Sequence, residues 1–318
     1  MQLLVEPDYG VFPILNAIHK ARRTIDMHIF RLAYKDIEKA LAAAVRRGVV
    51  VRTLIAHTSA SGEKALRKLE QRLLEIGATV SRTADDLVRY HGKVMIVDGG
   101  WLFVLAFNLT RRDIDESRTL GVATRKRRLV QEAIRLFEAD FDRKPYTGGV
   151  KDFLVSPVNA RERLAAFLTG ARRQLLIYDQ GVTDKAMLRV LQSRLKAGVD
   201  VRIIGKVEKG HDLSAERYPG KRQHLRCIVR DGQAAFVGSQ SLCTVELDAR
   251  REIGVIVKDP KVVRGIARMF ESDWAETDAG KKQAKDEKDK DKERDKDKEK
   301  GRKADEGGAK GEAASPGA

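Results

Sequence analysis

Residues 89–98 read RYHGKVMIVD, and this segment combines a strand pattern with charged side chains. The run VMIV (94–97) is continuously apolar, which predicts a short buried strand. His91 and Lys93 are one residue apart, so their side chains lie on the same face of an extended chain, and Asp98 ends the run. The segment is therefore a candidate for both a core strand and a chemical site.

The segment has a counterpart later in the sequence, because the chain is a tandem duplication. Residues 91–122 align with 224–255 without a gap, at an offset of 133 and with 10 identities in 32 positions. Two earlier pairs of segments align at an offset of 150 instead: 4–23 with 154–173, and 46–54 with 196–204. The 17 additional residues of the first half therefore fall in the connection after its second strand.

Each half has the apolar spacing of an α/β unit. Helix and strand patterns alternate as far as the second strand, and two strands around the histidine and an amphipathic helix complete the half. Gly48 and Gly198 each follow a helical pattern as a C-terminal stop. We expect an α/β fold of two tandem α/β/α-sandwich halves, residues 1–146 and 147–277, related by a pseudo-twofold axis.

Residues 278–318 differ from the rest in composition. Lys alternates with Asp and Glu, and there are too few apolar side chains to form a core, which predicts a disordered tail. Opposite charges at positions i and i+4 can support a transient helix in such a segment.

The excess positive charge lies in the part that is expected to fold. The chain has a formal net charge of +16 from 62 Lys+Arg and 46 Asp+Glu, and residues 1–277 hold 49 and 34 of these side chains. Such an excess attracts phospholipid head groups, nucleic acid and free phosphates alike. We therefore expect an anionic substrate or surface, and no pattern requires an oligomer.

The two cysteines, Cys227 and Cys243, are too few for a disulfide framework, and no Cys/His cluster has the spacing of a zinc site. We expect neither a metal nor another cofactor. No apolar run is long enough to cross a bilayer, and the first residues lack the pattern of a signal peptide. We expect a cytoplasmic or peripheral membrane protein, and a start that lies further upstream would leave export open.

The two aligned segments share a set of chemically active residues. The first half has His91-x-Lys93-x4-Asp98 with Asn108 downstream, and the second has His224-x-Arg226-x4-Asp231 with Ser239, Ser241 and Glu252 downstream. This duplicated pattern resembles the H-x-K-x4-D signature of the phospholipase D superfamily. The match is specific because both copies occur at corresponding positions of a repeat that was detected independently.

The resemblance implies a mechanism without a metal. In such enzymes one histidine attacks phosphorus to form a phosphohistidine, and the other protonates the leaving group and then activates water or an alcohol. It implies His91 and His224 as this pair, with His91 favoured as the nucleophile. The remaining candidates are Lys93, Arg226 and Asn108 as phosphate ligands, Ser239 and Ser241 as further substrate ligands, Glu252 as the carboxylate that orients a histidine, and Asp98 and Asp231 as support for local structure.

The second motif departs from the family pattern, and so does the first. Arg226 replaces the family lysine, Ser241 replaces an asparagine, and Thr119 stands where Glu252 stands in the other half. Thr119 lies 28 residues after His91, and Glu252 lies 28 residues after His224. We therefore expect Glu252 to orient His224. The two halves lack different residues, which is expected if they build one shared site.

The sequence thus predicts a phospholipase D-type enzyme, a phosphodiesterase or phosphatidyltransferase that acts on phospholipids. Two alternatives stay open. A nuclease of the same superfamily would use the same residues and the same charge. A non-catalytic protein that binds phosphate or membranes would also explain the degenerate second motif.

Overall fold

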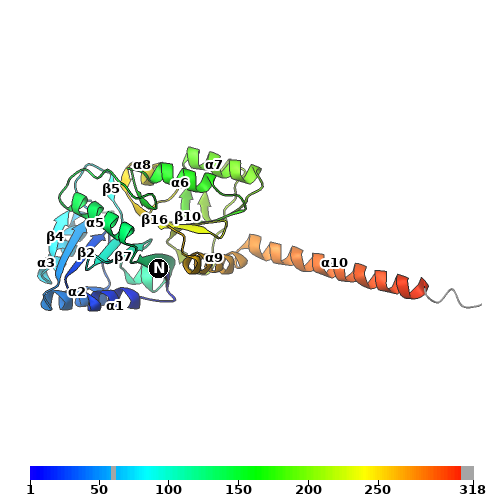
Figure 1. Cartoon of the computed structure of the whole chain (residues 1–318), viewed down its shortest axis with the longest axis horizontal. Coiled ribbons are helices and arrows are strands. Elements are labelled where there is room, and N and C mark those ends of the chain that lie inside the picture. Colours follow the sequence, from blue (N-terminus) through cyan, green and yellow to red (C-terminus); the bar gives the residue numbers. More distant parts are fainter. Residues whose placement is uncertain (59–61, 309–318) are drawn as a thin grey trace, which may run out of the picture.

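The computed structural model describes residues 1–58 and 62–308 and contains two mixed β-sheets with helices around them (Figure 1). The predicted α/β fold of two related halves is confirmed. The first sheet has the order β1-β8-β7-β6-β2-β3-β4. Its strands are β1 (Gln2–Glu6), β2 (Thr24–Ile29), β3 (Val50–Ile55), β4 (Thr79–Arg82), β6 (Val94–Val97), β7 (Trp101–Leu105) and β8 (Ser117–Thr124).

The second sheet repeats this order, from the other end, as β11-β10-β13-β14-β16-β9. Its strands are β9 (Phe153–Val155), β10 (Gln174–Val182), β11 (Asp200–Val207), β13 (Arg226–Arg230), β14 (Ala234–Gly238) and β16 (Ile253–Val257). Only the first half has a helix and a strand after its second long strand, α3 (Glu63–Glu75) and β4. These two elements account for the additional residues that the change in offset indicated.

Helices cover the three largest clusters of the hydrophobic core. On the outer face of the first sheet α1 (Phe12–Lys20) and α2 (Lys35–Arg46) cover one cluster, and α6 (Ala160–Thr169) and α7 (Lys185–Lys196) cover the corresponding cluster of the second sheet. The third cluster lies between the halves and includes α5 (Arg127–Phe141) and α9 (Pro260–Ala275). Because this cluster contains strands of both sheets, close packing fixes the position of one half against the other.

Helix starts follow local chemistry. The Asp184 carboxylate accepts hydrogen bonds from the backbone N–H groups of residues 186 and 187 at 3.1 and 3.0 Å and so caps α7. Asp259 caps α9 in the same way, and Pro260 occupies the first helical position, where no backbone donor is needed. Because each helix begins at a defined residue, the strands that are connected to it have defined positions in the sheet.

Two short parallel strand pairs join the halves. β5 (Arg89–Tyr90) pairs with β15 (Arg250–Arg251), and β12 (Arg222–Gln223) pairs with the start of β8. Each pair lies immediately before a motif histidine. The contacts are reciprocal, as a twofold relation between the halves requires.

Two ion pairs with buried carboxylates repeat this reciprocity. Arg251 of the second half lies 3.1 Å from Asp140 of the first, and Arg118 of the first half lies 3.1 Å from Asp273 of the second. Residues 142–152, between α5 and β9, form no helix or strand. The boundary at residue 146 falls in this segment and stays a prediction.

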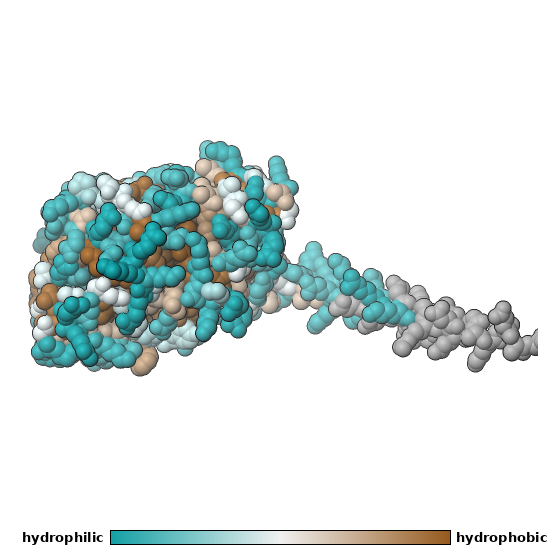
Figure 2. All heavy atoms as spheres, in the orientation of Figure 1, coloured by the Kyte–Doolittle hydropathy of each residue, from teal (hydrophilic) through white to brown (hydrophobic). Residues whose placement is uncertain are grey.

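The charged tail is a separate element at the end of the chain. Residues Asp278–Gly308 form helix α10, which projects away from the two sheets (Figure 1), and residues 309–318 of the predicted tail lie outside the described residues. Along α10, Gln283 donates to Glu287 at 3.1 Å, and Lys292 lies 3.4 Å from Asp289. Its described part is hydrophilic on the face shown in Figure 2, in agreement with a composition that has little to bury.

Candidate active site

His91 is held by the backbone of the other half. Its N–H donates to the carbonyl of Arg251 at 2.8 Å, and the N–H of Gly92 donates to the same carbonyl at 2.9 Å. A Cβ atom at Gly92 would lie 2.4 Å from Cδ1 of Ile253, which is fully buried. The glycine of the motif therefore permits the close approach that brings the two halves together at the histidine.

The His91 ring is oriented by Glu252. Its Nδ1 lies 3.0 and 2.9 Å from the two carboxylate oxygens of Glu252. The expectation that Glu252 orients His224 is therefore wrong. The spacing within the second half identified the right carboxylate. However, β15 pairs with β5 of the first half, so Glu252, the residue after β15, reaches the histidine of the first half.

This contact sets the chemical state of the ring. A hydrogen bond from Nδ1–H to Glu252 leaves Nε2 as the unprotonated nitrogen. Burial holds the pKa of His91 well below its ordinary range, and the charges of Lys93 and Arg226 lower it further. His91 is therefore a neutral imidazole with a lone pair on Nε2.

Lys93 lies against that lone pair. Its Nζ is 3.1 Å from Nε2 of His91 and donates to the His91 carbonyl at 2.7 Å. Burial lowers the pKa of Lys93 to about 7, although the nearby Glu252 carboxylate opposes the shift. An ammonium group beside the nucleophilic nitrogen is placed to take a phosphate oxygen when a substrate enters.

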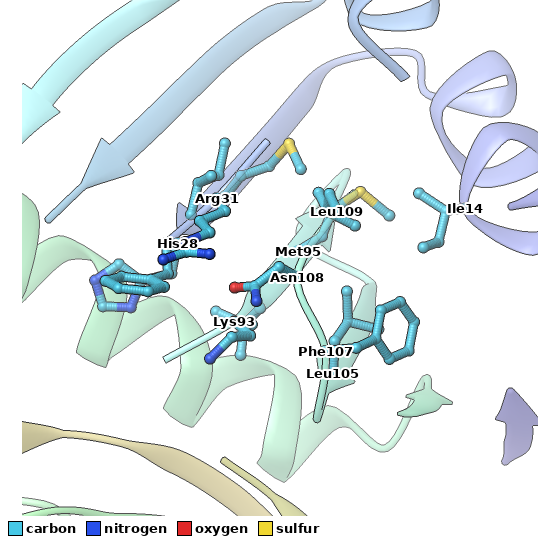
Figure 3. Close-up of a pocket in the computed structure, with 13 residues that line it drawn as sticks. Ile14, His28, Arg31, Lys93, Met95, Leu105, Phe107, Asn108 and Leu109 are labelled. Atoms are coloured by element: carbon cyan, nitrogen blue, oxygen red, sulfur yellow. The ribbon is translucent and has the colours of Figure 1, made fainter. Parts of the chain in front are cut away.

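Lys93 and Asn108 also form one wall of a small internal cavity (Figure 3). The figure shows the two side chains next to each other, with Met95 close by. The cavity has a volume of about 10 Å³ and is otherwise mostly apolar, so it holds one water at most. It lies behind the site and is too small for a substrate.

His224 is fixed in the same manner from the first half. Its backbone N–H donates to the carbonyl of Arg118 at 3.1 Å, and the Thr119 hydroxyl donates to the His224 carbonyl at 2.7 Å. The ring Nδ1 lies 3.1 Å from Oδ2 of Asp113. Burial lowers the pKa of His224, and Asp113 opposes this shift. Thr119 thus holds the backbone of the second motif, and Asp113 supplies the carboxylate beside the His224 ring.

Sequence reasoning missed Asp113. It lies in the short helix α4 (Arg111–Ile114) and accepts hydrogen bonds from both nitrogens of Asn108, at 3.0 and 2.8 Å, and from Nη1 of Arg222 at 2.7 Å. Burial alone would raise the pKa of Asp113, but His224 and these donors lower it. The available signal was a carboxylate at the matching position of both halves, since Asp113 aligns with Glu246.

Arg226 is anchored at two of its three nitrogens. Nε donates to the Ser241 hydroxyl at 3.0 Å, and Nη2 donates to Glu246 at 3.3 Å. Glu246 lies in α8 (Thr244–Asp248) and also accepts from the Ser241 N–H at 2.6 Å and from Arg250 at 2.9 Å. Nη1 of Arg226 is buried and has no hydrogen-bond partner among the described residues. It is therefore a cationic donor without such a partner, on a side chain that lines the cleft.

The two candidate serines lie behind the cleft lining. Ser241 positions Arg226, as above, and Ser239 is fully buried with its hydroxyl accepting from the N–H of Ile253 at 3.1 Å. Burial raises the pKa of Glu252, whereas the Ser239 hydroxyl lowers it. Both serines support charged residues of the site, and neither is among the residues that line the cleft.

Asp98 and Asp231 lie away from the cleft. The Asp98 carboxylate accepts from the backbone N–H groups of residues 22, 23 and 24, and Asp231 accepts from those of residues 172, 173 and 174. Asp98 therefore fixes the start of β2, and Asp231 fixes the start of β10. Neither aspartate is among the residues that line the cleft between the histidines.

The two histidines share one cleft of about 250 Å³. Four arginines that no motif marked in the sequence, Arg31, Arg112, Arg222 and Arg250, also line the cleft. Its lining is Phe30, Arg31, His91, Asn108, Thr110, Arg112, Asp113, Gln180, Arg222, His224, Arg226, Glu246 and Arg250. The site is strongly cationic and can neutralise a phosphate that carries more than one charge.

Residues 1–58 and 62–308 contain no cluster of three or more His, Cys, Asp or Glu side chains that could hold a metal. In the same part of the chain no helix is both long enough and apolar enough to cross a bilayer.

Comparisons with known proteins agree with this architecture. The sequence profile of the family described as "Cardiolipin synthase, PLD-like domain" matches residues 14–141 and 164–274. The fold is similar to that of a polyphosphate kinase from Porphyromonas gingivalis, with a TM-score of 0.72 and 20% identity over 86% of this chain and 50% of that one. This chain thus spans about half the length of that kinase.

A second similar fold is that of a phosphatidylserine synthase from Haemophilus influenzae Rd KW20, with a TM-score of 0.62 and 9% identity over 87% of this chain and 86% of that one. A search of curated proteins finds no match.

Proposed function

The chain belongs to the phospholipase D superfamily, in the family described as "Cardiolipin synthase, PLD-like domain", and from this we propose that it cleaves and transfers phosphodiester bonds through a phosphohistidine. One observation carries the proposal. His91 and His224 line a single cleft, and each ring has a carboxylate from the opposite half beside its Nδ1. A protein that only bound phosphate would not need two oriented imidazoles.

In the first step Nε2 of His91 attacks phosphorus, and a P–N bond forms as the P–O bond to the leaving group breaks. His224, in its protonated form, gives its Nε2 proton to the leaving oxygen. Lys93 and Nη1 of Arg226 take up the charge on the non-bridging oxygens. Glu252 stabilises the positive charge that develops on the His91 ring.

In the second step neutral His224 removes a proton from water or from an alcohol. The resulting oxygen attacks the phosphohistidine, the P–N bond breaks and its electron pair returns to Nε2 of His91. Water gives hydrolysis and an alcohol gives transfer. The same residues serve both outcomes, so the choice depends on which acceptor enters the cleft.

A phospholipid substrate is supported by a groove that continues from the cleft on the side of the first half. This groove, of about 370 Å³, shares Phe30, Arg31 and Thr110 with the cleft. Much of its lining is aliphatic: Leu32, Ala33, Ala65, Leu66 and Leu69. An apolar wall next to a cationic phosphate site suits a lipid phosphodiester.

A nuclease is the second candidate, and the arginines of the cleft favour it because they suit a chain of phosphates as well. The test is to incubate the protein with labelled phosphatidylglycerol vesicles and with single-stranded DNA, in EDTA, beside His91→Asn. We expect lipid turnover that His91→Asn abolishes. Cleavage of DNA alone would establish the nuclease, and turnover of neither substrate would contradict the enzyme proposal for both classes.

A further inference from the structure

A second groove continues from the cleft on the side of the second half. It has a volume of about 620 Å³ and shares Gln180 and Arg222 with the cleft. Three more cationic side chains line it, Lys206, Arg217 and Lys221. Its lining includes no carboxylate, and Glu276 lies beside Gly220 at its edge.

These three cations are available for a ligand. All three are exposed, and none of them forms an ion pair with another described residue. The polar floor beneath them is fixed, since Gln180 Nε2 donates to the Gln223 carbonyl at 3.3 Å and Gln223 Nε2 donates to the Ile204 carbonyl at 3.0 Å. The groove therefore combines a rigid floor with unpaired positive charge, an arrangement that attracts a polyanion.

Arg222 connects the groove with the catalytic centre. Its Nη1 donates to Asp113 at 2.7 Å and to the Ser117 hydroxyl at 3.0 Å. Asp113 is also the carboxylate beside the ring of His224. The groove thus begins on the side of the histidine that protonates the leaving group, whereas the aliphatic groove begins beside Phe30, whose ring contacts His91 at a centroid distance of 4.5 Å.

We propose that this cationic groove, lined by Lys206, Arg217, Lys221 and Arg222, binds a second phosphate carried by the leaving group of the substrate. The inference rests on the proposed function, with His224 as the acid. The two sides of the reacting phosphorus then differ: an apolar group stays with the phosphate on His91, and an anionic group departs on the side of His224. The second phosphate can be linked directly to the first or separated from it by a sugar.

The test is isothermal titration calorimetry on the full chain with inorganic phosphate, inorganic tripolyphosphate and a thymidine tetranucleotide. Tripolyphosphate carries directly linked phosphates and the tetranucleotide carries phosphates separated by sugars. We expect at least one of the two to bind about tenfold or more tightly than phosphate. The one that does identifies the linkage.

The double variant Lys206→Ala/Lys221→Ala should lose most of this advantage and bind inorganic phosphate as the wild type does. The control Lys20→Ala/Lys196→Ala removes the same charge from two exposed positions outside both grooves, and this variant should keep the binding advantage. Charge reversal, Lys206→Glu/Lys221→Glu, should weaken binding further, and unchanged circular dichroism melts should show that each variant is folded.

Equal affinity of the polyanions for the double variant and the wild type would overturn the inference, and so would the absence of any advantage over phosphate. Because the titration needs no turnover, the two proposals fail separately. A binding advantage without turnover of any diester would leave the subsite and remove the enzyme. Turnover of a diester without a binding advantage would support the enzyme and exclude the subsite.

Discussion

At the scale of single residues, the exchange of carboxylates between the halves determines what each histidine can do. Glu252 meets His91 and Asp113 meets His224, so the two rings have different partners in different surroundings. Glu252 is completely buried, whereas Asp113 also binds Arg222 at the cleft. The first arrangement suits a ring that must become positively charged on attack, and the second suits a ring that exchanges protons with the substrate.

Glu252→Gln should lower kcat for a phosphodiester by about 100-fold or more, because an amide cannot stabilise the charge that develops on His91. The rate of phosphohistidine formation, measured by rapid quench with a 4-nitrophenyl diester, should fall to a similar extent. Glu138→Gln is the control, since Glu138 pairs with Arg52 away from the cleft. A loss that appears only with poor leaving groups would instead show that Glu252 acts through the general acid, His224.

Asp113→Asn should act on the other ring. It removes the charge that favours protonated His224, so kcat/KM for an unactivated alkyl diester should fall by about 10- to 100-fold more than that for a 4-nitrophenyl diester, whose leaving group needs little protonation. His224→Asn should show the same difference between the two substrates. Equal losses for both substrates would argue against His224 as the acid.

The pH profile follows from two lowered pKa values. Burial lowers the pKa of His224 below 6.5, so its acid form is lost as pH rises through that lower value. The charged form of Lys93 is lost as pH rises through about 7. We expect kcat/KM for an alkyl diester to fall as pH rises through the lowered pKa of His224, whereas kcat/KM for a 4-nitrophenyl diester should persist until Lys93 loses its charge at about pH 7. An alkaline optimum for the alkyl diester would contradict these assignments.

At the scale of elements, the two short strand pairs β5–β15 and β8–β12 bring the site together. The sequence predicted the strands and helices of each half because apolar spacing is local, and the change in offset located α3 and β4. It did not predict which carboxylate meets which histidine. That depends on the docking of one half against the other, which the spacing within a half does not record. Asp113 could have been predicted from the sequence, because its counterpart Glu246 also carries a carboxylate.

Gly92 tests the close contact between these elements. A methyl group there would overlap the side chain of Ile253, so Gly92→Ala should lower the free energy of unfolding by about 1–3 kcal/mol and reduce turnover. Ile253→Ala should cost less stability in the Gly92→Ala protein than in the wild type, because the two changes share one space. The measurement is a double-mutant cycle by urea denaturation, with Ile256→Ala as the uncoupled control. Strict additivity of the first pair would refute the steric explanation.

At the scale of the whole molecule, the two halves form one core and α10 stands apart from it. Near its start, α10 is attached to the body by a hydrogen bond from the N–H of Ala279 to Glu216 at 3.3 Å. A chain that ends at residue 283 keeps this bond and loses little buried apolar area. Its melting temperature by differential scanning calorimetry should lie within about 2 °C of that of the full chain. A decrease of many degrees would mean that the tail contributes to folding.

The pairing of His91 with Glu252 joins residues that are 161 positions apart in the chain. Natural selection acting on either copy of the ancestral duplication is therefore also acting on the other. A change at Glu252 has its effect in the first copy, and a change at Asp113 has its effect in the second. We therefore expect aligned descendants to show these positions changing together across the repeat.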